Sequence, residues 1–126
     1  MSISVKSAKQ KGRKLQQLVR DKVIELLKPY GVVPEDVKST GMGQGGEDVQ
    51  LSPLARTFLP VSLECKSHKS FAVYKFYEQS QETAKGTDNK PVLVIKGDRK
   101  EPLAIIDLDY WLYLEECRIK YEGEME

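Results

Sequence analysis

Apolar residues recur at spacings of three and four over residues 11–31, which is the period of an amphipathic helix. The members of this pattern are Leu15, Leu18, Val19, Val23, Leu26 and Leu27. Pro29 and Gly31 follow, and both residue types end helices. The pattern therefore predicts one long helix close to the N-terminus.

A period of two appears between residues 59 and 66, where apolar and polar residues alternate. The apolar members are Val61, Leu63 and Cys65, and the polar members are Ser62, Glu64 and Lys66. Such alternation predicts a strand with one apolar face. The other face would carry a carboxylate and an ammonium group two residues apart. A shorter strand is predicted at 47–52, directly after the glycine-rich loop 41–46.

Apolar runs at 90–97 and 101–108 predict two further strands, joined by a hairpin-like GDRK turn. Residues 75–85 predict a helix that Gly86 closes. A last helix is predicted at 107–117, with Asp107 or Asp109 as its N-cap.

Three segments carry no clear helix or strand pattern. Residues 32–40 are interpreted as a short extended piece, and residues 53–58 as a connector. The acidic tail at 118–126 is expected to fray. The order of elements then predicts one α/β domain over 1–126, with a mixed sheet of about four or five strands flanked by helices. The helical crossover at 75–85 predicts that the strands on either side of it are parallel.

Composition places the chain among globular proteins, with 126 residues, 40% hydrophobic and 31% charged. Neither a membrane span nor the apolar core of a signal peptide is visible, so an intracellular protein without membrane contact is expected. Two cysteines, Cys65 and Cys117, are too few for a disulfide framework.

The net charge of +1 hides an asymmetry along the chain. Residues 1–28 hold eight basic residues against two acidic ones, whereas residues 101–126 hold eight acidic residues against two basic ones. A basic arm, about residues 1–11, can attract a polyanion such as DNA. A solubilising tail is the alternative interpretation.

Asp48 and Glu64 would approach each other if the strands at 47–52 and 61–66 pair as a hairpin. Two carboxylates brought together repel, and a hard divalent cation such as Mg²⁺ relieves that repulsion. Lys66 beside such a site could stabilise charge on a phosphate. Taken alone, Glu64 and Lys66 are equally compatible with a solvated strand face and a weak surface ion pair.

The segments EDVQL and SLECK together resemble the PD-(D/E)XK nuclease signature. The wider order is similar to archaeal-type Holliday-junction resolvases, including those of phages: a basic segment with KG, a helix, a Ser/Gly loop, the two strands, a helix and an apolar strand pair. The match runs from about residue 11 to residue 107. It implies a restriction-endonuclease-like fold.

The resemblance implies roles for individual residues. Asp48 and Glu64 would be metal ligands, the backbone carbonyl of Cys65 a third ligand, and Lys66 the catalytic lysine. The family has a glutamate on the first helix where this chain has Gln16, a departure that removes one negative charge. Ser39 would correspond to the loop serine that acts at the scissile phosphate.

Further residues are predicted to support the site or to contact DNA. Gln79 or Gln81 would orient the lysine or the substrate. The predicted DNA contacts are Lys9, Lys11, Arg13, Lys14, His68 and Lys69. The aromatic residues at 74, 76 and 77 would either stack on bases or pack into the core.

The leading hypothesis is an Mg²⁺-dependent endodeoxyribonuclease, with Mn²⁺ as a substitute, that resolves Holliday junctions or other branched DNA. Paired nicks in two strands suggest a homodimer, acting in a prokaryote or a phage-infected cell. One alternative is a general or repair nuclease on linear or flapped DNA. Another is a non-catalytic nucleic-acid-binding module of the same fold, with Gln16 as a sign of a decaying site.

Overall fold

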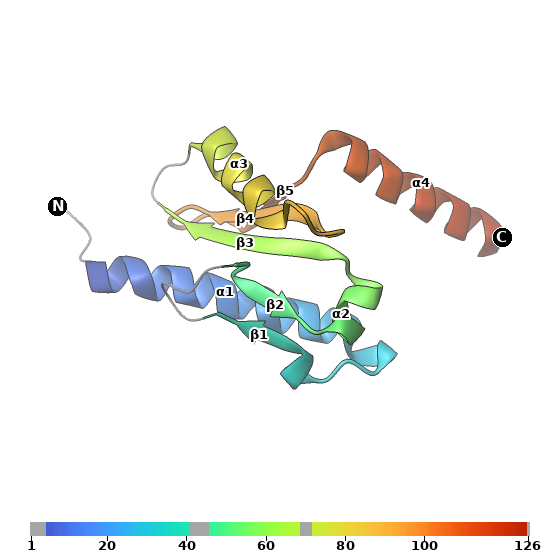
Figure 1. Ribbon diagram of the computed structural model, residues 1–126, viewed down its shortest axis with the longest axis horizontal. Coiled ribbons are helices and arrows are strands. Elements are labelled where there is room, and N and C mark those ends of the chain that lie inside the picture. Colours follow the sequence, from blue (N-terminus) through green and yellow to red (C-terminus); the bar gives the residue numbers. More distant parts are fainter. Residues whose placement is uncertain (1–4, 41–45, 69–71, 126) are drawn as a thin grey trace.

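Apart from one additional short helix, the helices and strands follow the order that the hydrophobic pattern predicts (Figure 1). The computed structural model describes residues 5–40, 46–68 and 72–125. The helices are α1 (Val5–Leu27), α2 (Pro53–Phe58), α3 (Val73–Ala84) and α4 (Leu108–Met125), with short 3₁₀ turns at Lys28–Tyr30 and Pro34–Asp36. The strands are β1 (Val37–Ser39), β2 (Val49–Leu51), β3 (Val61–Ser67), β4 (Lys90–Lys96) and β5 (Leu103–Ile105).

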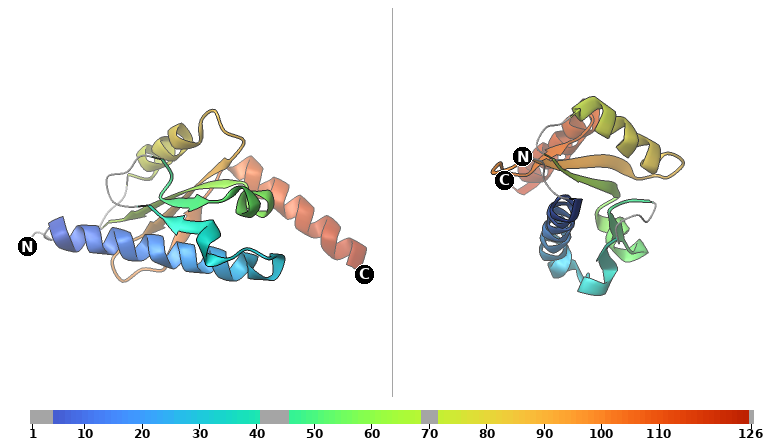
Figure 2. Two further views of the ribbon diagram at one scale, coloured as in Figure 1. Left: turned by 60° about the horizontal axis from the view of Figure 1, so that its bottom comes forward. Right: turned by 90° about the vertical axis from the view of Figure 1, so that its left-hand side faces the viewer.

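The five strands form one mixed sheet in the order β1-β2-β3-β4-β5. Strands β3 and β4 are parallel, as the helical crossover predicts, and the other neighbours are antiparallel. Helix α1 covers one face of the sheet and α3 covers the other (Figure 2). The predicted α/β architecture, a single domain with a mixed sheet between helices, is therefore confirmed.

The hydrophobic core lies between α1 and the sheet. Every fourth residue of one face of α1, Leu15, Val19, Val23 and Leu27, is buried there. From the sheet, the apolar face of β3 packs against this helix through Val61, Leu63 and Cys65. Gly31, with a φ of 88°, adopts the left-handed conformation just after α1 and its 3₁₀ turn, which ends the helix where Pro29 and Gly31 predict.

Three predicted segments differ from the structure. Residues 53–58 form helix α2 rather than a connector, because Ser52 caps its N-terminus and Pro53 occupies the first helical position. The basic arm 1–11 becomes helical from Val5, as the first part of α1. The acidic tail does not fray at 118, since α4 continues to Met125 with ion pairs from Arg118 to Glu115 and Glu122.

Two expectations are refined rather than overturned. Asp107, not Asp109, caps α4, because its Oδ2 accepts a hydrogen bond from the Tyr110 backbone at 3.0 Å. The glycine-rich loop, apart from Gly46, lies outside the described residues.

None of the described helices is both long enough and apolar enough to cross a bilayer.

Candidate metal and phosphate site

Strand β3 is covered on both faces, and its two faces carry different chemistry. The side chains of Ser62, Glu64 and Lys66 alternate with the apolar residues that meet α1, so they face α3. Contacts agree with this orientation, because Lys66 Nζ lies 5.4 Å from the centre of the Phe76 ring on α3. The acid and the base predicted to share one face therefore do so.

Asp48 reaches β3 from the residue just before β2. Its Oδ2 accepts a hydrogen bond of 2.8 Å from the backbone N–H of Cys65. Its own N–H donates to the Leu63 carbonyl at 2.9 Å, so Asp48 is fixed at two points. Because β2 and β3 are paired only through Val49 and Leu63, the Asp48 carboxylate takes the place of the next strand carbonyl.

The same geometry places the Cys65 carbonyl. In a β-strand, the N–H and C=O of one residue point to the same side. The Cys65 N–H points to Asp48, so its carbonyl also faces the Asp48 side of β3. Burial, together with the nearby Asp48 and Glu64 carboxylates, raises the pKa of the Cys65 thiol to about 12, so the thiol stays protonated. The backbone carbonyl of Cys65, and not its sulfur, is therefore the group that could bind a metal ion.

Glu64 meets Asp48 in a buried position, with only 8% of the residue exposed. Burial, followed by the charge of Asp48 and a hydrogen bond with it, raises the pKa of Glu64 from 4.5 to about 7. A hydrogen bond from Thr83 and the charge of Lys66 act in the opposite direction. A proton on Glu64 thus relieves the repulsion between two carboxylates, which is also what a bound cation would do.

Gln16 and Ser39 form a second polar pair, which joins α1 to β1 on the side of the sheet opposite α3. Gln16 is buried on α1, and its Oε1 accepts a hydrogen bond of 3.1 Å from Ser39 Oγ. Ser39 lies opposite Val49 in the β1–β2 ladder. The next residue, Thr40, donates both its N–H and its hydroxyl to the Asp48 carbonyl, at 2.9 and 3.1 Å. Ser39 is therefore linked to Asp48 through its neighbour Thr40.

Two residues of α3 lie against the polar face of β3: Phe76, which the sequence predicts either to stack on bases or to pack into the core, and Thr83, for which the sequence predicts no role. The Phe76 ring contacts both Lys66 and His68. The His68 ring stacks on the Phe76 ring, with centroids 5.2 Å apart. Thr83 is close enough to Glu64 to lower its pKa, and its hydroxyl donates to the Gln79 carbonyl at 3.2 Å. Their spacing of seven residues puts both on one side of a helix, and this signal could have singled them out once α3 is assigned. Gln79 and Gln81, predicted to support the lysine, are exposed on α3.

Helix α2 adds a partly buried ion pair that the connector interpretation could not predict. Arg56 forms an ion pair with Glu47, and its Nη1 donates to the Val61 carbonyl at 3.4 Å. The second carboxylate oxygen of Glu47 is buried and has no hydrogen-bond partner among the residues that the structure describes. This arrangement links the residue before Asp48 to the start of β3, and so helps to hold the two strands in register.

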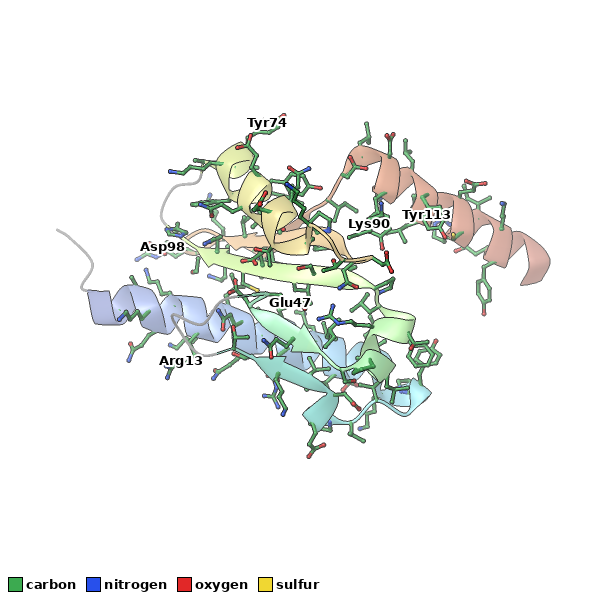
Figure 3. The ribbon with its side chains drawn as sticks, viewed as in Figure 1. Arg13, Glu47, Tyr74, Lys90, Asp98 and Tyr113 are labelled. Atoms are coloured by element: carbon green, nitrogen blue, oxygen red, sulfur yellow. The ribbon has the colours of Figure 1, made fainter. Side chains whose placement is uncertain are left out.

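Basic side chains surround the N-terminal half of α1 on both sides. On the β1 side, a cleft of about 570 Å³ is lined by Arg13, Arg20, Lys38 and Ser39, among others. On the β4 side, a cleft of about 430 Å³ is lined by Lys11, Lys14, Ser67, Lys96, Asp98 and Arg99, among others. Figure 3 shows Arg13 and Asp98 on opposite sides of this part of the helix.

These clefts include three of the predicted DNA contacts, Lys11, Arg13 and Lys14. Lys11 is held by Asp98 at 2.9 Å, which offsets part of its charge. Lys9 is exposed, and His68 is exposed while stacked on Phe76. Lys69 lies outside the described residues.

The candidate site brings together two carboxylates, those of Asp48 and Glu64. Among the described residues, no group of three or more His, Cys, Asp and Glu side chains gathers as a ready-made metal site. Mg²⁺ commonly binds through one or two carboxylates and keeps several waters, so the Asp48–Glu64 pair with a carbonyl fits that cation and not zinc.

Comparison of the chain with protein-family models, with curated proteins and with solved structures finds no match.

Proposed function

We propose that this chain is a metal-dependent endodeoxyribonuclease that hydrolyses phosphodiester bonds in branched DNA. The observation that carries the proposal is the meeting of Asp48, just before β2, with Glu64 of β3, and Lys66 lies on the same face of β3 as Glu64. Burial of two carboxylates that repel each other, next to a lysine, lowers the stability of the fold. A bound ligand that contacts these groups would explain their presence.

Each residue has a distinct role in this proposal. Asp48, Glu64 and the Cys65 carbonyl would hold Mg²⁺ or Mn²⁺. A divalent cation bound there supplies an activated water and polarises a phosphoryl oxygen. Lys66 would donate to the phosphate oxygen on which charge develops, and the Phe76 ring holds its ammonium group in place.

Gln16 and Ser39 would act on the substrate rather than on the cation. The neutral amide of Gln16 brings no negative charge, so among the described residues the carboxylates of the site are those of Asp48 and Glu64. Because Ser39 donates its hydroxyl proton to Gln16, the Ser39 oxygen has a fixed orientation beside the β1 cleft. This fixed polar pair would position a phosphate that enters the cleft.

The two basic clefts support DNA as the substrate. Phosphate contacts from lysine and arginine position a duplex without reading its sequence. One cleft includes Ser39, and the other includes Ser67, the residue after Lys66. Clefts on both sides of α1 would let two DNA segments approach one site, which suits a branched substrate. Paired nicks in a four-way junction would require two copies of the site, and therefore a homodimer.

A cleavage assay tests this proposal. A synthetic four-way junction and a linear duplex are incubated with wild type and Asp48→Asn, in Mg²⁺ and then in Mn²⁺. Asp88→Asn, which changes an exposed aspartate, is the matched control. The proposal expects paired nicks in the junction for wild type and the control, and none for Asp48→Asn. Cleavage of both substrates would indicate a general or repair nuclease instead.

One observation favours a second candidate, a non-catalytic DNA-binding module. Gln16 is neutral, and its carbonyl oxygen accepts the Ser39 hydroxyl proton. Under this alternative, the junction binds with equal affinity in Mg²⁺ and in a chelator, and no cleavage occurs in either cation. Gln16→Glu separates the two candidates, since a decayed site would gain cleavage from the restored charge.

A further inference from the structure

An aromatic stack stands at the end of β3, next to the proposed catalytic lysine. His68 directly follows β3, and its ring stacks on that of Phe76 in the first turn of α3, with an angle of 23° between the two planes. Phe76 is partly buried and also contacts Lys66, whereas His68 is exposed. The two rings therefore extend an aromatic surface from Lys66 out to solvent.

The backbone holds this stack at one edge of the sheet. The N–H of His68 donates to the Lys96 carbonyl at 3.3 Å, and Lys96 is the last residue of β4. Ser67 lies opposite Lys96 in the parallel β3–β4 ladder. The histidine thus stands at the carboxyl end of a parallel strand pair, which is where α/β sheets commonly bind ligands.

Cationic side chains adjoin the stack. Ser67 and Lys96, the neighbours of His68 along the chain and across the ladder, line the β4-side cleft together with Lys14 and Arg99. Figure 1 shows that the start of α1, the end of β3 and the start of α3 lie at the same end of the molecule. Groups that bind phosphate and a ring that can stack on a base are therefore close together.

The same cleft also contains an acid. Asp98 is paired with Lys11 at 2.9 Å, so these two charges largely offset each other. The lining side chains of Lys14, Lys96 and Arg99 then give the cleft a positive balance. The cleft is therefore suited to a phosphate group next to the stack.

This combination favours an unpaired nucleotide over a duplex. A positively charged groove beside an aromatic side chain is the arrangement with which proteins bind single strands. In a continuous duplex, each base is covered on both faces by its neighbours, so a base must leave the stack before it can lie on His68. If His68 only covered Phe76, its position beside a phosphate-binding cleft would have no use.

We propose that the stacked rings of His68 and Phe76 bind the base of one unpaired nucleotide, while the β4-side cleft holds its phosphate. The inference rests on the proposed nuclease function for the position of this nucleotide beside the scissile phosphate, and it deepens that function. It names the feature that the site selects, a base that has left the duplex. Branched and flapped DNA presents such bases, and continuous duplex does not.

Binding of two fluorescent single strands in a chelator tests this site without any cleavage. One strand is oligothymidine, and the other has the same number of phosphates but no bases. We expect wild type to bind oligothymidine about fivefold or more tightly than the abasic strand. His68→Ala should remove this preference, whereas His68→Trp should keep it, because a ring remains available for stacking.

Tyr74→Ala is the control, since Tyr74 is an aromatic residue of α3 that is 84% exposed and points away from the sheet (Figure 3). It should bind both strands as wild type does. Equal binding of the two strands by wild type, binding of neither, or an unchanged preference in His68→Ala would overturn the proposal. A preference that His68→Trp loses as fully as His68→Ala would also overturn it, because a ring at this position would then not be what binds.

The outcome separates the base site from the nuclease. A preference for oligothymidine that depends on His68, in a protein that cleaves no DNA in Mg²⁺ or Mn²⁺, would support the base site and contradict the proposed nuclease. Cleavage of the junction by a protein with no preference between the two strands would support the nuclease and overturn the base site.

Discussion

The seven residues of β3 alternate between its two faces, and the two faces differ in chemistry. On the α1 face, Val61, Leu63 and Cys65 are buried in the hydrophobic core. On the α3 face, Glu64 and Lys66 meet Asp48, Thr83 and Phe76. Burial removes apolar area from water on the first face, but on the second it raises the energy of a charged carboxylate.

This difference teaches where stability and function separate in a small domain. Substitutions on the α1 face should cost folding free energy and leave the chemistry of each folded molecule intact. Substitutions on the α3 face should change the chemistry without lowering the free energy of unfolding. Four predictions test that separation, from the largest expected effect to the smallest.

Lys66→Ala should abolish most of the proposed cleavage. Loss of one donor to developing charge costs about 10²–10³-fold in rate, while folding should change little because Lys66 is only partly buried. Lys90→Ala is the matched control, since Lys90 Nζ lies 5.8 Å from the Tyr110 ring in a similar pairing. Single-turnover junction cleavage measures both, and an equal loss in the two variants would contradict the role of Lys66.

Leu63→Ala should destabilise the fold by about 2–5 kcal/mol, because it leaves a cavity in the core between α1 and the sheet. Urea unfolding monitored by circular dichroism measures the change. Leu54→Ala, at an exposed leucine of α2, should cost much less. If the folded Leu63→Ala protein lost cleavage while remaining as stable as wild type, the two faces of β3 would not be separate.

Glu64→Gln should stabilise the metal-free protein at neutral and higher pH. The pKa of Glu64 is raised from 4.5 to about 7 in the folded state, so the native carboxyl holds its proton more tightly than the unfolded one. Wild type therefore loses stability as pH rises through that window, by roughly 1–3 kcal/mol. The glutamine variant lacks this loss.

Urea unfolding in a chelator at pH 5 and pH 8 measures that difference. Glu82→Gln, at an exposed position of α3, should follow wild type at both pH values. A Glu64→Gln variant whose stability falls with pH as much as that of wild type would show that Glu64 does not carry the effect.

Phe76→Leu should lower the cleavage rate a few-fold, because the ring holds Lys66 with about 0.5–1 kcal/mol of cation–π attraction. Phe76→Tyr should restore the rate, since it keeps the ring. Tyr74→Leu serves as the control for loss of an aromatic residue from α3. A rate that falls equally for leucine and tyrosine at position 76 would point to packing rather than to the ring's attraction for the lysine.

The strand framework and the approach of Asp48 to Glu64 were predictable from local patterns. The period of two in β3 identified the polar face, and the crossover identified the parallel pair β3–β4. The antiparallel pairing of β2 with β3, predicted as a hairpin and formed across helix α2, brings Asp48 to Glu64. These features depend on alternation and chain order, which a single sequence carries.

The parts that were not predicted depend on tertiary contacts. Helix α2 is six residues long, too short for a helical period to appear, and its cap Ser52 is its main local signal. The roles of Phe76 and Thr83 depend on which side of α3 meets β3. The continuation of α4 through an acidic segment depends on ion pairs one turn apart, which only a helix can form.

Cation binding to the Asp48–Glu64 pair tests the account most directly. Mn²⁺ titrations followed by electron paramagnetic resonance, with junction DNA present, would compare wild type, Asp48→Asn and the control Asp88→Asn. The account predicts saturable Mn²⁺ binding to wild type and control, and at least tenfold weaker binding to Asp48→Asn. Equal binding by all three proteins, or none by wild type, would contradict a metal site at this pair.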